Sequence, residues 1–155
     1  MRAVVQRVTG AEVLVEGEVV GAIGPGLCVL LGCGPNDTAD TARHLAGRLG
    51  TLRVLADEAG RMNRDLGSTG GEVLVVSQFT LYADTSRGHR PSFVGAGPPA
   101  VAERLCEVFC DALRGLGLRV ATGRFGAHMR VRLENDGPVT LVLSSGEPPW
   151  AADAG

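Results

Sequence analysis

The chain of 155 residues contains no lysine, because all 15 of its basic residues are arginine. Without lysine it cannot form a Schiff base, use a phosphate-loop lysine or build a serine–lysine nucleophile pair. Its four cysteines form no C-x-x-C pair and have no histidine partner at metal-ligand spacing. We therefore expect no metal site, and we expect the thiols to be buried in a reducing compartment.

Long apolar runs and an excess of positive charge are also missing. No run approaches the roughly 20 apolar residues of a membrane span, and the first residues lack an apolar stretch followed by a cleavage site. We expect a cytoplasmic protein with no membrane partner. The formal net charge of −2 gives no general attraction for polyanions, so any nucleic-acid contact must be local and small.

Apolar periodicity predicts one mixed domain. Strands are expected at residues 3–8, 11–15, 19–23, 27–31, 53–56, 72–79, 119–122, 129–133 and 139–143. One helix should follow a cap at Asp37 or Thr38, and a second should span residues 100–116. We expect an α+β domain over residues 1–143, with a twisted, largely antiparallel sheet curled toward a barrel and two main helices packed outside. The tail over residues 144–155 should be poorly ordered.

The second predicted helix has an apolar stripe, and a long loop precedes it. The stripe comprises Val101, Leu105, Val108, Ala112 and Leu116. Residues 84–99 are rich in Gly, Pro and Ser, and loops of this length in a compact domain are usually functional or mobile.

Gly137-Pro138 lies between two strand-like runs. Proline has no N–H for a ladder and glycine contributes no packing, so we expect an exposed junction that does not continue a sheet. Glycine also relieves the clash before proline, so an unusual backbone, even a cis bond, can be held there. The alternative is an ordinary hairpin turn made by residues 135–138.

Nucleophile patterns are weak, which leaves hydroxyls, amides and backbone dipoles for any catalysis. Ser77 lacks the flanking glycines of a hydrolase elbow, and no triad partners are recognisable. Such groups cluster in Ser77-Gln78-Phe79-Thr80-Leu81, at the end of a buried strand, where unpaired backbone N–H groups can stabilise an oxyanion. Gln78 and Thr80 should share one face, and Ser77, Phe79 and Leu81 the other. The alternative is a strand that ends in polar residues as it reaches solvent.

Two segments together resemble the signature motifs of the D-aminoacyl-tRNA deacylases. These are Ser77-Gln78-Phe79-Thr80-Leu81 and Asn135-Asp136-Gly137-Pro138-Val139-Thr140. Three further segments match that family in order and at similar separations: Gln6-Arg7-Val8, the loop at residues 87–93 and the stretch at residues 122–129. The resemblance covers roughly residues 1–143.

The resemblance implies an enzyme that hydrolyses the ester between a D-amino acid and the 3′-terminal adenosine of tRNA, without metal or organic cofactor. It implies a homodimer with shared active sites, each receiving the Gly137-Pro138 pair of the partner chain. In such families this bond is cis, so both carbonyl oxygens point into the pocket. They would crowd the side chain of an L-amino acid. Glycine, which has no side chain, should be accepted with the D-amino acids.

The same resemblance implies roles for individual residues. Backbone N–H groups near Phe79 and Thr80 resemble the oxyanion donors, and Ser77 and Gln78 line the site. Because nothing in the sequence activates Thr80, we expect water to attack, helped by the 2′-OH of the ribose. Substrate contacts are expected from Phe125 and Met129, which resemble an adenine pocket, and from Val139 and Thr140. Arg7 should hold the Gly-Pro pair through its rigid donor fork.

Two other functions remain open from the residues alone. One is an RNA-end-binding module of the same fold without turnover, since fold does not fix function. The other is a small-molecule ester hydrolase that uses Thr80 as its nucleophile.

Overall fold

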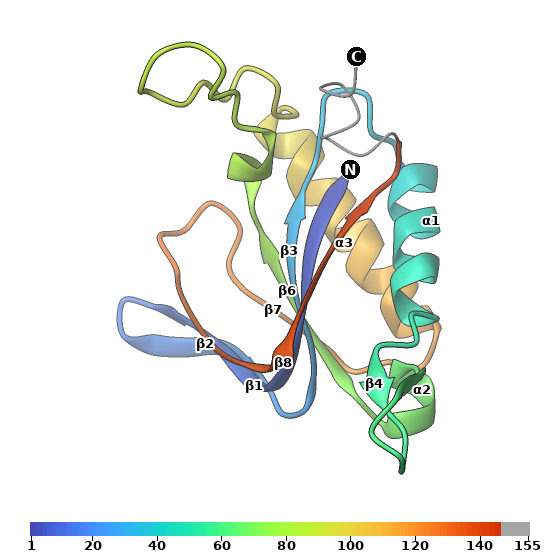
Figure 1. Cartoon of the computed structure of the whole chain (residues 1–155). Coiled ribbons are helices and arrows are strands. Elements are labelled where there is room, and N and C mark those ends of the chain that lie inside the picture. The colour runs from blue at the N-terminus through green and yellow to red at the C-terminus, as the bar shows by residue number, and fades with distance from the viewer. Residues whose placement is uncertain (147–155) are drawn as a thin grey trace.

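The computed structural model describes residues 1–146, which form a curved sheet with helices against one side (Figure 1). The main sheet contains β1 (Arg2–Val15), β2 (Glu18–Ile23), β3 (Gly26–Gly32), β6 (Glu72–Ser77), β7 (Val120–Thr122) and β8 (Arg130–Ser144). A small ribbon is made by β4 (Leu55–Ala56) and β5 (Met62–Arg64). The helices are α1 (Ala39–Gly50), α2 (Leu66–Thr69), α3 (Pro99–Gly115) and the 3-10 turn η1 (Phe79–Tyr82).

The sheet contains both parallel and antiparallel strands, and it curls until β2 and β7, at the two ends of the strand order, come into contact. Its order is β2-β1-β3-β6-β7, with β8 beside β1. Strand β1 is antiparallel to β2, β3 and β8, whereas β6 is parallel to β3 and β7. At the closing edge a Cβ on Gly21 of β2 would lie 2.2 Å from the carbonyl oxygen of Thr122 in β7. Only glycine allows this approach, and the predicted α+β fold with a sheet curled toward a barrel is confirmed.

Two apolar clusters fill the molecule. The first lies between the sheet and the pair α1 and α3, and it includes Val5, Leu27, Leu45 and Phe109. The second is formed by sheet residues such as Val8, Val13 and Leu74. Helix α1 starts at the predicted cap, where the Thr38 hydroxyl accepts a hydrogen bond from the Thr41 N–H at 3.3 Å.

The expected apolar stripe of α3 is right in its middle and wrong at its ends. Leu105 is buried, and Val108 and Ala112 pack against the core. The helix buries Ala102, Leu105, Phe109, Cys110 and Leu113. Val101 and Leu116 are instead 44% and 53% exposed. Both stripes have helical spacing, so periodicity alone could not choose between them. The contact with α1 and the sheet selected the face that carries Phe109.

Strand β8 is continuous on both sides of Gly137-Pro138. Val8 of β1 pairs with Asn135, and Gln6 pairs with Thr140, so residues 136–139 bulge out opposite Arg7. The ladder therefore stops at the Gly-Pro pair, as predicted. The alternative of a hairpin turn is wrong, because both halves of β8 pair with the same strand.

The described chain ends just beyond β8. Ser144 is the last residue of that strand, and the Ser145 N–H donates to the Met1 carbonyl oxygen at 3.0 Å. The tail predicted after Leu143 lies outside the described residues from position 147 on, and the domain boundary stays a prediction. Within residues 1–146 no helix is long and apolar enough to cross a membrane.

Candidate active site

The candidate site begins where β6 leaves the sheet. Residues Val73–Val76 are buried, and the ladder to β3 extends one step further, because the Gln78 N–H donates to the Leu31 carbonyl oxygen at 2.8 Å. The chain then turns into η1. Strand geometry ends at Ser77, so the expected alternation of side chains does not continue through η1. The Gln78 and Thr80 side chains nevertheless meet, as predicted.

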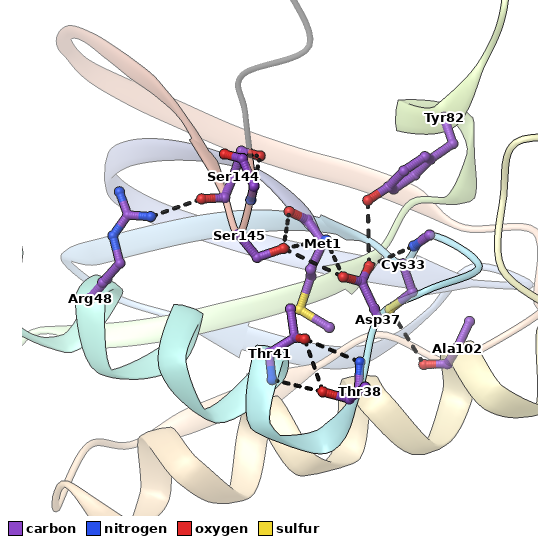
Figure 2. A network of polar contacts seen from close by, with 12 residues as sticks. Met1, Cys33, Asp37, Thr38, Thr41, Arg48, Tyr82, Ala102, Ser144 and Ser145 are labelled. Carbon is purple, nitrogen blue, oxygen red and sulfur yellow. Dashed lines mark hydrogen bonds and ion pairs between the residues drawn. The ribbon is translucent and has the colours of Figure 1, made fainter.

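Polar contacts hold η1 against the start of the chain. The Arg2 guanidinium donates to the Leu81 carbonyl oxygen at 2.9 Å and lies 4.3 Å from the centre of the Tyr82 ring. The Tyr82 hydroxyl reaches the Asp37 carboxylate at 3.4 Å, and that carboxylate also pairs with the Met1 amino group at 2.5 Å (Figure 2). Burial, together with the Asp37 charge, raises the pKa of the Tyr82 hydroxyl. Tyr82 is therefore a neutral anchor for η1.

Two backbone N–H groups at the start of η1 have no acceptor within residues 1–146. Leu81 N–H donates to the Gln78 carbonyl oxygen and Ala83 N–H to that of Thr80. No hydrogen bond found among residues 1–146 uses the N–H of Phe79 or Thr80 as its donor. The first N–H groups of a helical turn lack internal partners, so they are available to a ligand. This arrangement can stabilise a negative oxygen.

A cavity of about 520 Å³ opens beside Phe79, the first residue of η1. It is lined by Ser77, Gln78 and Phe79, by the end of β3, by the start of α3 and by Phe125. The Phe79 and Phe93 rings meet edge to face at its rim, with centroids 5.1 Å apart. A second hollow of about 470 Å³ adjoins it and shares Ser77 and Phe125. The volume and the apolar, aromatic lining suit a small organic group.

Two thiols lie in the cavity wall. Cys33 donates weakly to the Ala102 carbonyl oxygen at 3.8 Å, as Figure 2 shows, and Cys106 lies one turn further along α3. A hydrogen bond from the Cys106 thiol lowers the pKa of Cys33, and the same bond and burial raise the pKa of Cys106. All four cysteines are free, and Cys28, Cys33 and Cys110 are buried.

The Gly137-Pro138 bond is cis, and both residues are exposed. Arg7 holds the bulge from one side: its Nε donates to the Asp136 carbonyl oxygen at 2.9 Å, and another guanidinium nitrogen donates to the Val54 carbonyl oxygen at 2.8 Å. Arg7 also pairs with the Asp136 carboxylate at 3.4 Å. The bulge is thus tied to the body of the protein by one side chain.

Asn135 holds the bulge from within β8. Its Oδ1 accepts from the Val139 N–H at 2.8 Å, and its Nδ2 donates to the Val139 carbonyl oxygen at 3.3 Å and the Thr140 hydroxyl at 3.1 Å. Gln6 donates to the same Thr140 hydroxyl at 3.2 Å. These bonds replace the missing ladder contacts, so the projecting pair has a defined shape.

One chain does not bring the Gly-Pro pair to its own cavity. In the register of the sheet, Ser77 of β6 pairs with Leu31 of β3, which pairs with Ala3 of β1, which pairs with Leu143 of β8. The bulge in β8 lies instead opposite Arg7 of β1. Four residues along a strand span about 13 Å, and the three strand spacings from β6 to β8 span about 14 Å. The two segments that carry the motifs therefore lie at different ends of the sheet and on strands that are not neighbours (Figure 1).

The other predicted site residues divide between these regions. Phe125 lines both hollows. Thr80 is not a lining residue of the cavity, and its hydroxyl accepts from the Gln78 side-chain amide. Met129 packs against the second apolar cluster and lies close to Gly123. Its substrate contact, like the roles of the other residues, stays a prediction.

Phe93 lies in the loop at residues 87–93, and its sequence context gives no role for this side chain. Loop aromatics give no periodic signal, so only the contact with Phe79 reveals its place at the rim. Among residues 1–146 no group of three or more His, Cys, Asp or Glu side chains could hold a metal ion.

Comparison with known proteins agrees with the geometry. The family described as D-Tyr-tRNA(Tyr) deacylase matches residues 4–144. The D-aminoacyl-tRNA deacylase of Roseiflexus sp. (strain RS-1) is 62% identical over 145 residues, covering 94% of each chain. That of Deinococcus radiodurans is 59% identical over 143 residues, covering 92% of this chain and 99% of the relative.

Solved structures show the same fold. A structure titled "c-Myc DNA Unwinding Element Binding Protein" superimposes with a TM-score of 0.88 at 42% identity, covering 95% of this chain and all of the other. A probable eukaryotic D-amino acid tRNA deacylase gives a TM-score of 0.81 at 19% identity, covering 92% and 97% of the two chains. The chain belongs to the D-aminoacyl-tRNA deacylase family of hydrolases.

Proposed function

We propose that this chain hydrolyses the ester between a D-amino acid, or glycine, and the 3′-terminal adenosine of tRNA, and so proofreads translation in the cytoplasm. Family membership supports the reaction class. The observation that carries the proposal is the pair of free N–H groups, on Phe79 and Thr80, beside a cavity of about 520 Å³.

In this reaction a water oxygen attacks the ester carbonyl carbon. The carbonyl oxygen becomes negative as the tetrahedral intermediate forms, and the Phe79 and Thr80 N–H groups donate to it. Each such donor is typically worth about 3 kcal/mol of transition-state stabilisation. The intermediate then expels the ribose 3′ oxygen, which takes up the proton that the attacking water gives up, and the free amino acid is released.

The chain's own side chains position the reactants in this proposal. Gln78 donates to the Thr80 hydroxyl, and no acceptor for that hydroxyl's proton occurs among the hydrogen bonds of the described chain. Thr80 therefore lacks the adjacent base that an attacking hydroxyl needs. The ribose 2′-OH is the remaining neighbour that can position or activate water.

Selectivity is assigned to Gly137-Pro138 of a second copy of the chain. The pair is exposed, is fixed in shape by Arg7 and Asn135, and lies far from the cavity of its own chain. Inserted into another copy's cavity, its two carbonyl oxygens would occupy the space of an L side chain. A D-amino acid and glycine both place hydrogen there, so neither would be refused.

Such insertion requires a homodimer with shared sites. Strand β8 has β1 as its only neighbour among the strands of residues 1–146, so its 15 residues leave one edge open. Val142 on this strand is 42% exposed, and Val4 and Leu30 on neighbouring strands are half-buried. An open edge with an apolar sheet face is a surface that a second copy can cover.

The terminal adenine is assigned to the aromatic part of the cavity. Phe125 lines the same cavity as the Phe79–Phe93 pair, and a flat base can stack on any of these rings. Met129 lies behind Gly123 and would contact the base only if its flexible thioether turns toward it. Val139 and Thr140 would reach the substrate together with the Gly-Pro pair.

The activity is tested with purified protein and tRNA charged with D-tyrosine, L-tyrosine or glycine. Release of D-tyrosine and glycine with L-tyrosine retained supports the proposal. Equal release of D- and L-tyrosine would refute the selectivity. Release of none, with tRNA still bound, would favour an RNA-end-binding module.

The shared site is tested by mixing two damaged proteins. One carries Arg7→Ala, which frees the Gly-Pro segment, and the other carries Gln78→Ala in the cavity wall. If sites are shared, a mixed dimer has one site in which both elements are intact, and unfolding and refolding the mixture should restore selective D-tyrosine release. Activity no greater than the sum of the separate variants would contradict shared sites.

A further inference from the structure

The loop between η1 and α3 carries a concentrated positive charge in a chain whose net charge is −2. Residues 84–95 are all exposed and include Arg87, His89 and Arg90. Asp84 is the only acidic residue among them, and its carboxylate accepts a hydrogen bond from the Ser86 N–H at 2.9 Å.

The base of this loop is attached to the cavity. Asp84 and Ser92 exchange backbone hydrogen bonds of 2.7 and 2.9 Å, which close the loop into a narrow arm. Gly97 N–H donates to the Cys33 carbonyl oxygen at 2.9 Å, and the Phe93 ring packs on Phe79. The arm projects away from the sheet, beyond η1 (Figure 1). Its charged tip is therefore held outside the cavity mouth.

The cations of the tip are not used by the fold. Within residues 1–146, the side chains of Arg87, His89 and Arg90 take part in none of the ion pairs or hydrogen bonds found. Arg7 and Arg132, by contrast, each bind a carboxylate on another element or segment. Exposed arginines with no partner in the protein have their full donor forks free for an external anion.

We propose that Arg87 and Arg90, together with His89, bind the phosphates of the single-stranded nucleotides that precede the terminal adenosine of tRNA. This inference rests on the proposed function, which places the terminal nucleoside in the cavity. The chain of phosphates must leave that cavity through its mouth, where the arm stands. Arginine forks bind phosphate in pairs of parallel hydrogen bonds, without reading the base.

The arm also explains how a protein of net charge −2 can hold a polyanion. A contact with two or three phosphates needs only local cations, and most of the tRNA would lie too far away to interact electrostatically with the protein. The expected contact is therefore short, sequence-independent and sensitive to salt.

The test compares Arg87→Gln/Arg90→Gln with the wild type on two substrates: D-tyrosyl-tRNA and D-tyrosyl-adenosine, which has the same ester and no phosphate. We expect KM for the charged tRNA to rise about tenfold with kcat nearly unchanged, and kcat/KM for the short ester to stay the same. For the charged tRNA, the slope of log(kcat/KM) against log salt concentration should become shallower by about 1.4. This change corresponds to two lost phosphate contacts on a single strand.

Arg43→Gln/Arg61→Gln is the matched control, since both arginines are exposed and lie on α1 and the β4–β5 turn, away from the cavity. It should leave both substrates unaffected. Equal losses on both substrates in the Arg87/Arg90 variant would overturn the inference, because the loop would then act on the cavity itself. Unchanged kinetics on both would overturn it too.

A wild type that cleaves neither ester would refute the proposed function instead, and binding of labelled single-stranded RNA ending in CCA then tests the arm directly. Weaker binding by the Arg87/Arg90 variant supports the inference, and equal binding overturns it.

Discussion

The two motif segments of this protein differ in what surrounds them. Residues 77–82 begin at the end of a buried strand, and the first three of them line a cavity. Two of their backbone N–H groups have no acceptor among residues 1–146. Residues 135–140 interrupt an exposed strand, and side chains of Arg7, Gln6 and Asn135 satisfy or restrain their polar groups. The first segment offers binding groups inside a hollow. The second offers a fixed shape on the outside.

This difference suggests a division of tasks. Free donors beside a cavity can act on a bound substrate, whereas a fixed projection can act only on something brought to it. If both segments serve one site, the projection must enter the cavity of another copy. The predictions below separate the two tasks, beginning with the largest effect.

The strongest test of the cavity segment is Gly32→Ala. A Cβ at this position would lie 2.8 Å from the Gln78 carbonyl oxygen and 3.1 Å from the Leu81 Cβ, so the start of η1 must move. We expect kcat/KM for D-tyrosyl-tRNA to fall about 100-fold, because displaced oxyanion donors lose most of their effect.

Gly47→Ala is the control for that variant. Gly47 lies within α1 with nothing within 4 Å of its added Cβ, so alanine should raise the free energy of unfolding by about 0.5–1 kcal/mol. Its activity should be unchanged. A Gly32→Ala enzyme with activity within about threefold of wild type would show that the position of η1 does not limit the reaction.

The matching test of the projecting segment is Arg7→Ala. This substitution removes the guanidinium donors to the carbonyl oxygens of Asp136 and Val54, which must then bind water instead. The loss should lower the free energy of unfolding by about 1–3 kcal/mol. We expect the ratio of D- to L-tyrosine release to fall about tenfold or more, while D-tyrosine release falls less. The measurement is kcat/KM on both charged tRNAs.

Arg132→Ala controls for the loss of an arginine between the same two strands. Arg132 of β8 pairs with Glu12 of β1 at 3.1 Å and is 65% exposed. Its replacement should lower the free energy of unfolding by at most about 1 kcal/mol and leave selectivity intact. If both variants lost selectivity equally, the bulge would have no special part in it.

Thr80→Ala should have a smaller effect on activity. The hydroxyl receives a hydrogen bond from Gln78 and has no base beside it among the described contacts, so water attack predicts activity within about tenfold of wild type. Single-turnover deacylation and tRNA binding should be measured together. Complete loss of turnover with unchanged binding would instead identify Thr80 as the nucleophile.

The last prediction concerns the free energy of unfolding at high pH. It depends on buried thiols outside both motif segments, so it should affect neither segment selectively. Burial raises the pKa of Cys28 and of Cys110 from 9.0 to about 11. A raised pKa in the folded state means that the stabilisation is complete below pH 9 and is lost as pH rises toward 11. Each thiol should contribute about 2 kcal/mol to that loss.

Denaturant unfolding from pH 8 to pH 11 measures this dependence. Cys28→Ala should flatten the decline between pH 9 and pH 11, whatever it does to the stability at pH 8. An unchanged slope would mean that this thiol is not shielded from water in the folded protein.

Local signals in the sequence predicted several elements well. The continuous apolar runs at residues 27–31 and 73–76 became the buried parts of strands β3 and β6. Thr38 was one of two expected caps because its hydroxyl can accept from the first turn, and it caps α1. Each of these features depends on neighbours within a few residues, which is why sequence was enough.

Other features depend on distant contacts. The chain near Gly137 could have turned into a hairpin, and it instead continues along β1 because residues 2–14 offer a long edge on both sides of the bulge. Phe93 lies in an irregular loop, and its contact with Phe79 comes only from the folded arrangement. The buried face of α3 was likewise chosen by what packs against it.

The sequence by itself determined the chemical inventory: no lysine, no nucleophile pattern, and two motifs whose polar and backbone groups are what remains for catalysis and selection. Tertiary structure alone decided that the first motif borders a cavity with unpaired N–H groups, and that the second is fixed in shape about 13 Å further along the sheet and about 14 Å across it. The reason is physical: residue types are properties of the chain, whereas distances between distant segments arise only from strand pairing and packing.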